Sequence, residues 1–102
     1  MHKRAFERIH VNIEAKFSCC HEDYTGIINN ISESGMFVLA DMNFPFNPQV
    51  KIHIQQKERI LSVDVKIVRV AKTKNFYNGM GVEVVQPTEE YLKFVNGLKI
   101  YL

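Results

Sequence analysis

Two arginines near the amino terminus have the chemistry to hold an anionic ligand. Arg4 and Arg8 are four residues apart, and Lys3 directly precedes Arg4. Guanidinium groups bind phosphate through paired hydrogen bonds, pair with the O6 and N7 atoms of guanine, and stack on flat rings. Two such groups near a chain end are suited to closing over a planar anion. Taken alone, however, this spacing is more typical of a solvated basic tail.

A short polar stretch is the second candidate. It reads Asn30-Ile31-Ser32-Glu33-Ser34-Gly35. Asn and Ser offer short donors and acceptors at a strand end, and Gly35 can take a positive φ and let a ligand approach the backbone. Taken alone, this stretch is more typical of an ordinary hairpin turn.

Metal and catalytic signals are weaker. Residues 19–23 (CCHED) gather metal-capable atoms, but adjacent cysteines do not easily face one ion, and only His53 follows as a later partner. Structural zinc sites usually show two spaced pairs, so a polar turn without metal is favoured. No Ser/His/Asp or Cys/His set has the placement that catalysis needs, and we expect no enzyme. The histidines are interpreted as solvent-facing: His2, His10, His21 and His53.

Four aromatic residues fall in predicted loops and are a candidate stacking surface for single-stranded nucleic acid, as in small barrels of the OB type. They are Phe44, Phe46, Phe76 and Tyr77. The chain has 13 basic and 11 acidic residues and a net charge of +2. That bias is too small for a partner of bulk nucleic acid, so we favour aromatics that cover the mouth of a barrel.

The elements that must position these residues follow mainly a period of two. Apolar and polar residues alternate over 9–18, and further strands are predicted at 24–31, 36–40, 50–54, 61–70 and 80–84. Gly26 suggests a bend or a close backbone approach, and a phase slip predicts a bulge near Ile67-Val68. Residues 19–23 and 41–48 are predicted to be connections.

Helical spacing is found only at the end of the chain. Thr88 is a good N-cap, and an apolar stripe follows that predicts a helix of about ten residues with fraying at Gly97. The stripe consists of Tyr91, Phe94 or Val95, Leu98 and Leu102. The pattern therefore predicts an all-β fold, a six-stranded antiparallel barrel with one C-terminal helix.

Length and composition bound the remaining classes. The 102 residues suffice for one domain, and 46% hydrophobic with 24% charged residues excludes a disordered chain. No apolar stretch suits a secretion signal or a spanning helix. We therefore expect no membrane insertion, a cytoplasmic location and a single domain over 1–102, with a mobile arm at 1–8, a barrel at 9–86 and a helix at 88–100.

The two candidate segments together resemble the PilZ domain family, whose members bind cyclic di-GMP. Family members carry R-x-x-x-R before the first strand, matched by Arg4 and Arg8, and [D/N]-x-S-x-x-G, matched by Asn30, Ser32 and Gly35. Residues 61–70 are similar to the fifth strand of the family and residues 80–83 to its "GVxF" strand. Lys3 stands where many members have arginine, and Asn30 where aspartate is commoner.

The resemblance implies a bacterial receptor for cyclic di-GMP with no other cofactor and no metal. It implies that the ligand contacts are made by Lys3, Arg4, Arg8, Asn30, Ser32 and Gly35. On binding, the arm would close over the ligand and form a new surface for a downstream protein, in processes such as motility or biofilm formation. The alternative is a PilZ-fold protein-interaction module with weak or no ligand binding. The sequence allows a monomer or a homodimer.

Overall fold

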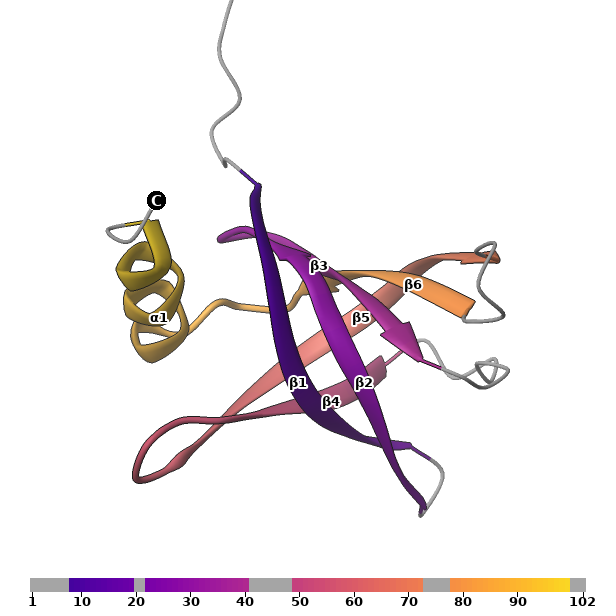
Figure 1. Ribbon diagram of the computed structural model, residues 1–102, viewed down its shortest axis with the longest axis horizontal. Helices are drawn as coiled ribbons and strands as arrows, with labels where there is room; N and C mark the ends of the chain where they lie inside the picture. Colours follow the sequence, from indigo (N-terminus) through magenta and orange to yellow (C-terminus); the bar gives the residue numbers. More distant parts are fainter. Residues whose placement is uncertain (1–7, 20–21, 41–48, 73–77, 100–102) are drawn as a thin grey trace, which may run out of the picture.

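The chain forms six strands followed by one helix (Figure 1). The computed structural model describes residues 8–19, 22–40, 49–72 and 78–99. The elements are β1 (Ile9–Cys19), β2 (Glu22–Ile31), β3 (Gly35–Ala40), β4 (Gln49–Gln55), β5 (Ile60–Lys72), β6 (Asn78–Val84) and α1 (Glu89–Lys99). The predicted all-β fold with one C-terminal helix is confirmed.

The strands close into a barrel in the order β1-β2-β3-β6-β5-β4, and every neighbouring pair is antiparallel. The ladder between β1 and β4 is short, with four residue pairs from Ala15↔Ile54 to Ser18↔Lys51, and the ladder between β2 and β3 also has four. Short connections favour antiparallel pairing of the four pairs that are successive in the chain: β1 with β2, β2 with β3, β4 with β5, and β5 with β6.

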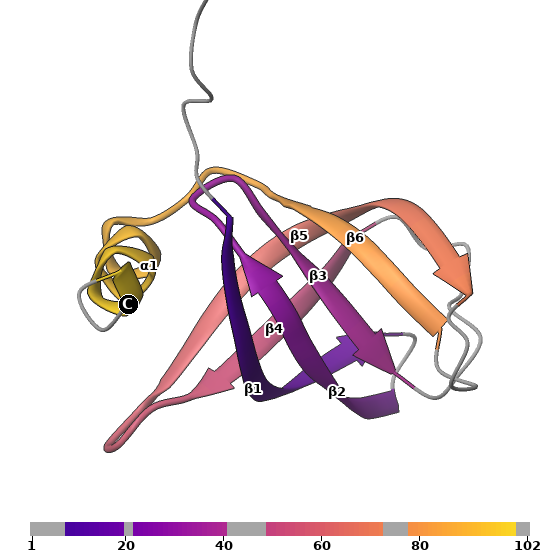
Figure 2. The ribbon, with the colours of Figure 1, turned by 45° about the horizontal axis from the view of Figure 1, so that its top comes forward.

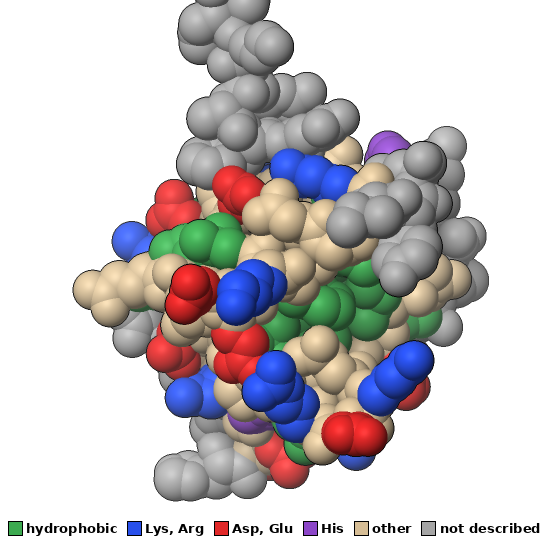
Figure 3. All heavy atoms as spheres, turned by 90° about the vertical axis from the view of Figure 1, so that its left-hand side faces the viewer, with side chains coloured by type: hydrophobic (Ala, Val, Ile, Leu, Met, Phe, Trp, Pro, Cys, Tyr) green, Lys and Arg blue, Asp and Glu red, His purple; other side chains and the backbone are tan. Residues whose placement is uncertain are grey.

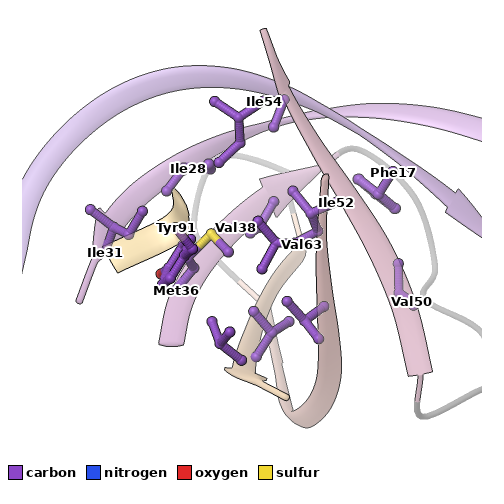
Figure 4. Close-up of a cluster of buried hydrophobic side chains, with 14 of the residues drawn as sticks. Phe17, Ile28, Ile31, Met36, Val38, Val50, Ile52, Ile54, Val63 and Tyr91 are labelled. Carbon is purple, nitrogen blue, oxygen red and sulfur yellow. The ribbon is translucent and has the colours of Figure 1, made fainter. Parts of the chain in front are cut away.

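The barrel interior is filled by the residues that the period of two assigned to one face. Ala15 and Phe17 on β1, Met36 and Val38 on β3, and the alternate apolar residues of β4 and β5 are buried (Figure 4). Their neighbours in sequence point outward, because successive side chains of a strand alternate between its faces. The core is therefore a layer of apolar side chains enclosed by all six strands.

Irregularities in the ladders were predicted in part. The bulge near Ile67-Val68 is confirmed by a register shift between Ile67 and Arg69. Two further shifts, between His10 and Ile13 and between Ile28 and Asn30, were not predicted. The connection predicted at 19–23 was too long: Cys19 pairs with Glu22, so the strands continue almost to the turn. Backbone pairing overrides the polar character of these residues.

The helix is capped and packed largely as expected. Thr88 Oγ1 accepts the backbone N–H of Tyr91 at 3.1 Å, which confirms the N-cap. Tyr91 and Val95 are buried, whereas Phe94 and Leu98 are only partly buried against the core. The predicted fraying at Gly97 was wrong, since the helix runs on to Lys99.

Several predicted features lie outside the described residues. They are the arm up to residue 7, which includes Lys3 and Arg4, the cluster members Cys20 and His21, the loop aromatics Phe44, Phe46, Phe76 and Tyr77, and Leu102.

Candidate ligand site at the β2–β3 turn

The turn between β2 and β3 is organised by the side chain of Ser32. Its Oγ accepts the backbone N–H groups of Ser34 and Gly35, each at 3.2 Å, and lies 3.2 Å from the Ser34 hydroxyl. The Ser32 N–H donates to the Gly35 carbonyl at 2.8 Å. Among the described residues, Ser32 is the one buried polar residue, 1% exposed. Its hydroxyl therefore accepts the hydrogen bonds from the backbone N–H groups of the turn that water would otherwise accept.

Helix α1 is fastened to the same turn. The Tyr91 hydroxyl donates to the Ser32 carbonyl at 2.6 Å, inside the protein. On the surface, the Asn96 amide donates to a Glu33 carboxylate oxygen at 2.9 Å. Burial raises the pKa of Tyr91 well above its usual value near 10; the Arg8 charge lowers it and the Glu33 charge raises it further. Tyr91 therefore stays protonated and can donate throughout the physiological range.

Arg8 meets the beginning of the second motif. Its guanidinium Nη1 donates to the side-chain Oδ1 of Asn30, and the bond lies at the surface. The pairing of β1 with β2 sets this contact, because His10 pairs directly with Asn30 and Ile9 with Ile31. The start of β1, the β2–β3 turn and the connection into α1 lie at one end of the barrel (Figure 2). The structure thus brings Arg8, Asn30, Ser32 and Gly35 together.

Gly35 is explained by packing and not by a special backbone angle. No glycine in the described part of the chain has a positive φ. A Cβ at Gly35 would collide with the Val82 carbonyl oxygen on β6. The close approach expected at Gly26 is confirmed, because a Cβ there would lie 2.7 Å from the Leu39 carbonyl oxygen. Gly35 therefore lets β6 pack against the turn, and the Val84 N–H donates to the Ser34 carbonyl at 2.9 Å.

The described members of the other candidate groups do not form a metal site. Within residues 8–19, 22–40, 49–72 and 78–99, no three His, Cys, Asp or Glu side chains are placed to hold a metal ion. His10 is exposed as expected, whereas His53 is half-buried, with Nδ1 2.9 Å from the Ser62 hydroxyl and Nε2 3.3 Å from the Ser18 hydroxyl. On the side of the molecule that carries α1, acidic and basic side chains are interspersed (Figure 3).

Residues 2–97 match the PilZ domain family. The chain belongs to this family. No curated protein is similar enough in sequence to be matched. No helix in the described ranges has both the length and the apolar character to cross a membrane.

Solved PilZ structures share the fold at low identity. The PilZ domain of YcgR from Escherichia coli with c-di-GMP superposes with a TM-score of 0.78 at 11% identity, covering 99% of this chain and 92% of that one. The PilZ domain of CeSA from a cellulose-synthesizing bacterium gives 0.68 at 19%, with 91% and 98% covered.

A longer protein is also similar. The Bacillus subtilis inhibitor of motility, MotI/DgrA, gives a TM-score of 0.80 at 16% identity, covering 99% of this chain. This PilZ chain spans about half of that protein, 51% of its length. The six-stranded barrel with a C-terminal helix is therefore the PilZ fold.

The sequence predicted that Tyr91 lies in the core but did not predict the role of its hydroxyl. Its position in the apolar stripe predicted a core residue, and it is one. The hydroxyl bond to the Ser32 carbonyl spans 59 residues of sequence. The available signal was a tyrosine at a fully apolar position, since a buried hydroxyl needs a partner.

Proposed function

We propose that this PilZ domain is a receptor for cyclic di-GMP and not an enzyme. The ligand carries two guanines and two phosphates, so it presents both flat rings and two negative charges. Arg4 and Arg8 would bind phosphates and guanine edges from the arm, with Lys3 beside them. Asn30 would bind a guanine edge, and the turn held by Ser32 and Gly35 would fix the position of Asn30.

The bond between Arg8 and Asn30 is the observation that carries this proposal. It joins the two family motifs, 22 residues apart, at one exposed place on the barrel. An exposed guanidinium bonded to a neutral amide keeps its full charge, and an incoming phosphate or guanine can take over its hydrogen bonds. In this proposal Ser32 holds the turn and is not a surface group that binds the ligand, because its hydroxyl already accepts the backbone N–H groups of Ser34 and Gly35.

The output would be a protein–protein contact. Ligand and arm together would form a new surface on the barrel for a partner protein, in a signalling process such as motility or biofilm control. The proposal places the receptor in the cytoplasm, where thiols stay reduced and adjacent cysteines need no disulfide.

Isothermal titration with cyclic di-GMP tests the proposal, with linear pGpG and GTP as competing ligands. The wild-type chain should bind, and Arg4→Ala and Arg8→Ala should abolish binding. Arg8 is exposed, so its loss should leave the melting temperature of the free protein unchanged. Ligand should raise the melting temperature of the wild type, since it binds the folded state.

Arg59→Ala is the matched control. Arg59 is exposed and pairs with Glu90 at 3.4 Å, so this variant removes the same single charge away from the turn. Wild-type affinity in both arm variants would reject the arm mechanism. A flat titration without a thermal shift would favour the interaction module that lacks ligand binding.

A further inference from the structure

Four polar side chains on the outer face of the barrel form a chain of hydrogen bonds across four strands. They are Asp23 on β2, Ser18 on β1, His53 on β4 and Ser62 on β5. The Ser18 hydroxyl lies 2.9 Å from an Asp23 carboxylate oxygen and 3.3 Å from His53 Nε2. On the other side of the ring, His53 Nδ1 lies 2.9 Å from the Ser62 hydroxyl. The strand order brings the four together, because β1 lies between β2 and β4, and β4 lies beside β5.

The direction of each hydrogen bond follows from the carboxylate at one end. A carboxylate only accepts, so the single hydroxyl proton of Ser18 goes to Asp23. Ser18 Oγ can then only accept from the imidazole, which places a proton on His53 Nε2. In the neutral ring Nδ1 therefore has no proton, and it accepts the hydroxyl proton of Ser62. Ser62 donates to His53, His53 donates to Ser18, and Ser18 donates to Asp23.

This order of groups is the one that activates a hydroxyl. A serine hydroxyl is a weak nucleophile until a base lies within hydrogen-bond reach and a third group orients that base. His53 is the base for Ser62, and Ser18 orients it and links it to the negative charge of Asp23, which stabilises the imidazolium. Ser62 is exposed and His53 is half-buried, so the nucleophile is open to a reagent while the base is held in place.

The backbone beside Ser62 offers a donor for a developing negative charge. The Val85 N–H donates to the Asp64 carbonyl at 2.9 Å, so the backbone groups of Asp64 point toward β6. Backbone groups alternate along a strand, so the N–H of Ser62, two residues earlier, points to the same side. Within the described strands the ladder of β5 with β6 ends at Val65↔Val84, and β6 does not pair with Ser62. This N–H therefore lies beside Oγ where an oxyanion donor is needed.

We propose that Ser62 is a reactive serine that takes an acyl group from an activated ester, with His53 as its general base. Ser62 Oγ forms a bond to the carbonyl carbon, and the leaving oxygen departs from that carbon with its electron pair. The proton of Ser62 passes to His53 Nδ1 and from there to the leaving group. The step is one acylation of the chain itself without turnover. It takes place near the β1–β2 turn, at the other end of β2 from the proposed ligand site.

Acetylation by p-nitrophenyl acetate, followed over time by mass spectrometry of peptides, tests the proposal. The wild type should acquire an acetyl group on Ser62, and its rate is measured against acetylation of the exposed Lys57 in the same sample. A positioned general base contributes about 100-fold or more, so His53→Ala should slow the modification of Ser62 by on the order of 100-fold while Lys57 reacts as before. His10→Ala, which removes an exposed histidine outside this chain of bonds, is the matched control and should react like the wild type.

Ser18 is a positioning residue, and two variants separate orientation from stability. Ser18→Ala removes the acceptor of the His53 Nε2–H and should slow the modification by roughly tenfold, whereas Ser18→Thr keeps a hydroxyl and should restore most of the rate. Circular dichroism checks that each variant is folded. A wild type in which Ser62 stays unmodified when Lys57 is fully acetylated would overturn the inference, as would equal rates at Ser62 in the wild type and in His53→Ala. Titration with cyclic di-GMP tests the proposed function independently of either result.

Discussion

Replacing Tyr91 by phenylalanine should destabilise the domain through one buried oxygen. The ring of Tyr91 stays in the core, but the Ser32 carbonyl loses the donor that lies 2.6 Å away. A net hydrogen bond contributes about 1 kcal/mol, and a buried acceptor left without a partner costs about 1–3 kcal/mol. We therefore expect the free energy of unfolding to fall by about 2 kcal/mol. For a domain of this size the melting temperature should fall by on the order of 10 °C.

The same variant has a defined pH dependence. Burial raises the pKa of Tyr91 in the folded state, whereas an unfolded tyrosine titrates near 10. The stabilisation is therefore fully present below pH 10 and declines as the pH rises above it, because the unfolded state then loses a proton that the folded state keeps. The difference in stability between the wild type and Tyr91→Phe should shrink by about 1.4 kcal/mol at pH 11, relative to pH 8.

Urea unfolding of both proteins at pH 8 and pH 11, followed by circular dichroism, measures these differences. Tyr24→Phe is the matched control, because the Tyr24 hydroxyl donates to a Glu22 carboxylate oxygen at the surface, at 3.4 Å. Its stability should stay within about 0.5 kcal/mol of the wild type. A Tyr91→Phe protein as stable as the wild type at pH 8, or a difference that does not change with pH, would refute this account of the turn.

Two pairs of changes test the helix and the barrel. Thr88→Ala should lower the stability by about 1 kcal/mol, measured by thermal unfolding, because the Tyr91 N–H loses its side-chain acceptor; a change to Ser at the same position should retain most of it, and equal losses in both would contradict the cap. Gly97→Ala should raise the stability by about 1 kcal/mol, since no atom lies within 4 Å of the added Cβ and Gly is a poor helix residue. Gly26→Ala should lower the stability, because the added Cβ lies 2.7 Å from the Leu39 carbonyl oxygen. A gain in stability in both glycine variants would show that β2 can move enough to admit the methyl group.

The sequence patterns were sufficient for the barrel because burial here follows the period of two. Phe17 and Ala15, for example, lie on the face that alternation assigns to the core. The bulge in β5 was also visible, since an extra residue changes the phase of the apolar positions. The bulges in β1 and β2 left the apolar alternation of β1 intact, or lay among polar residues such as Asn29 and Asn30, so no pattern revealed them.

The candidate site could be predicted only as far as local motifs reach. Asn30, Ser32 and Gly35 were found by their types and spacing, but their roles depend on elements distant in the sequence. Gly35 is small because β6 passes over it, and Ser32 is held by a tyrosine of the helix. The approach of β6 to this turn likewise depends on strand order, since β3 lies beside β6 and not beside β4.

The short ladder between β1 and β4 determines how the first strand can move. Within the described strands, the paired residues of the first half of β1 (Ile9, His10, Ile13 and Glu14) pair with β2 alone, and β4 joins only from Ala15 onward. Amide protons in this half of β1 should therefore exchange with solvent together with those of β2, while the ladder between β1 and β4 remains paired. Arg8 directly precedes β1 of this two-stranded ribbon, and Asn30 lies on its β2 strand. The spacing between the arginine and its asparagine is thus preserved even when the ribbon flexes against the rest of the wall.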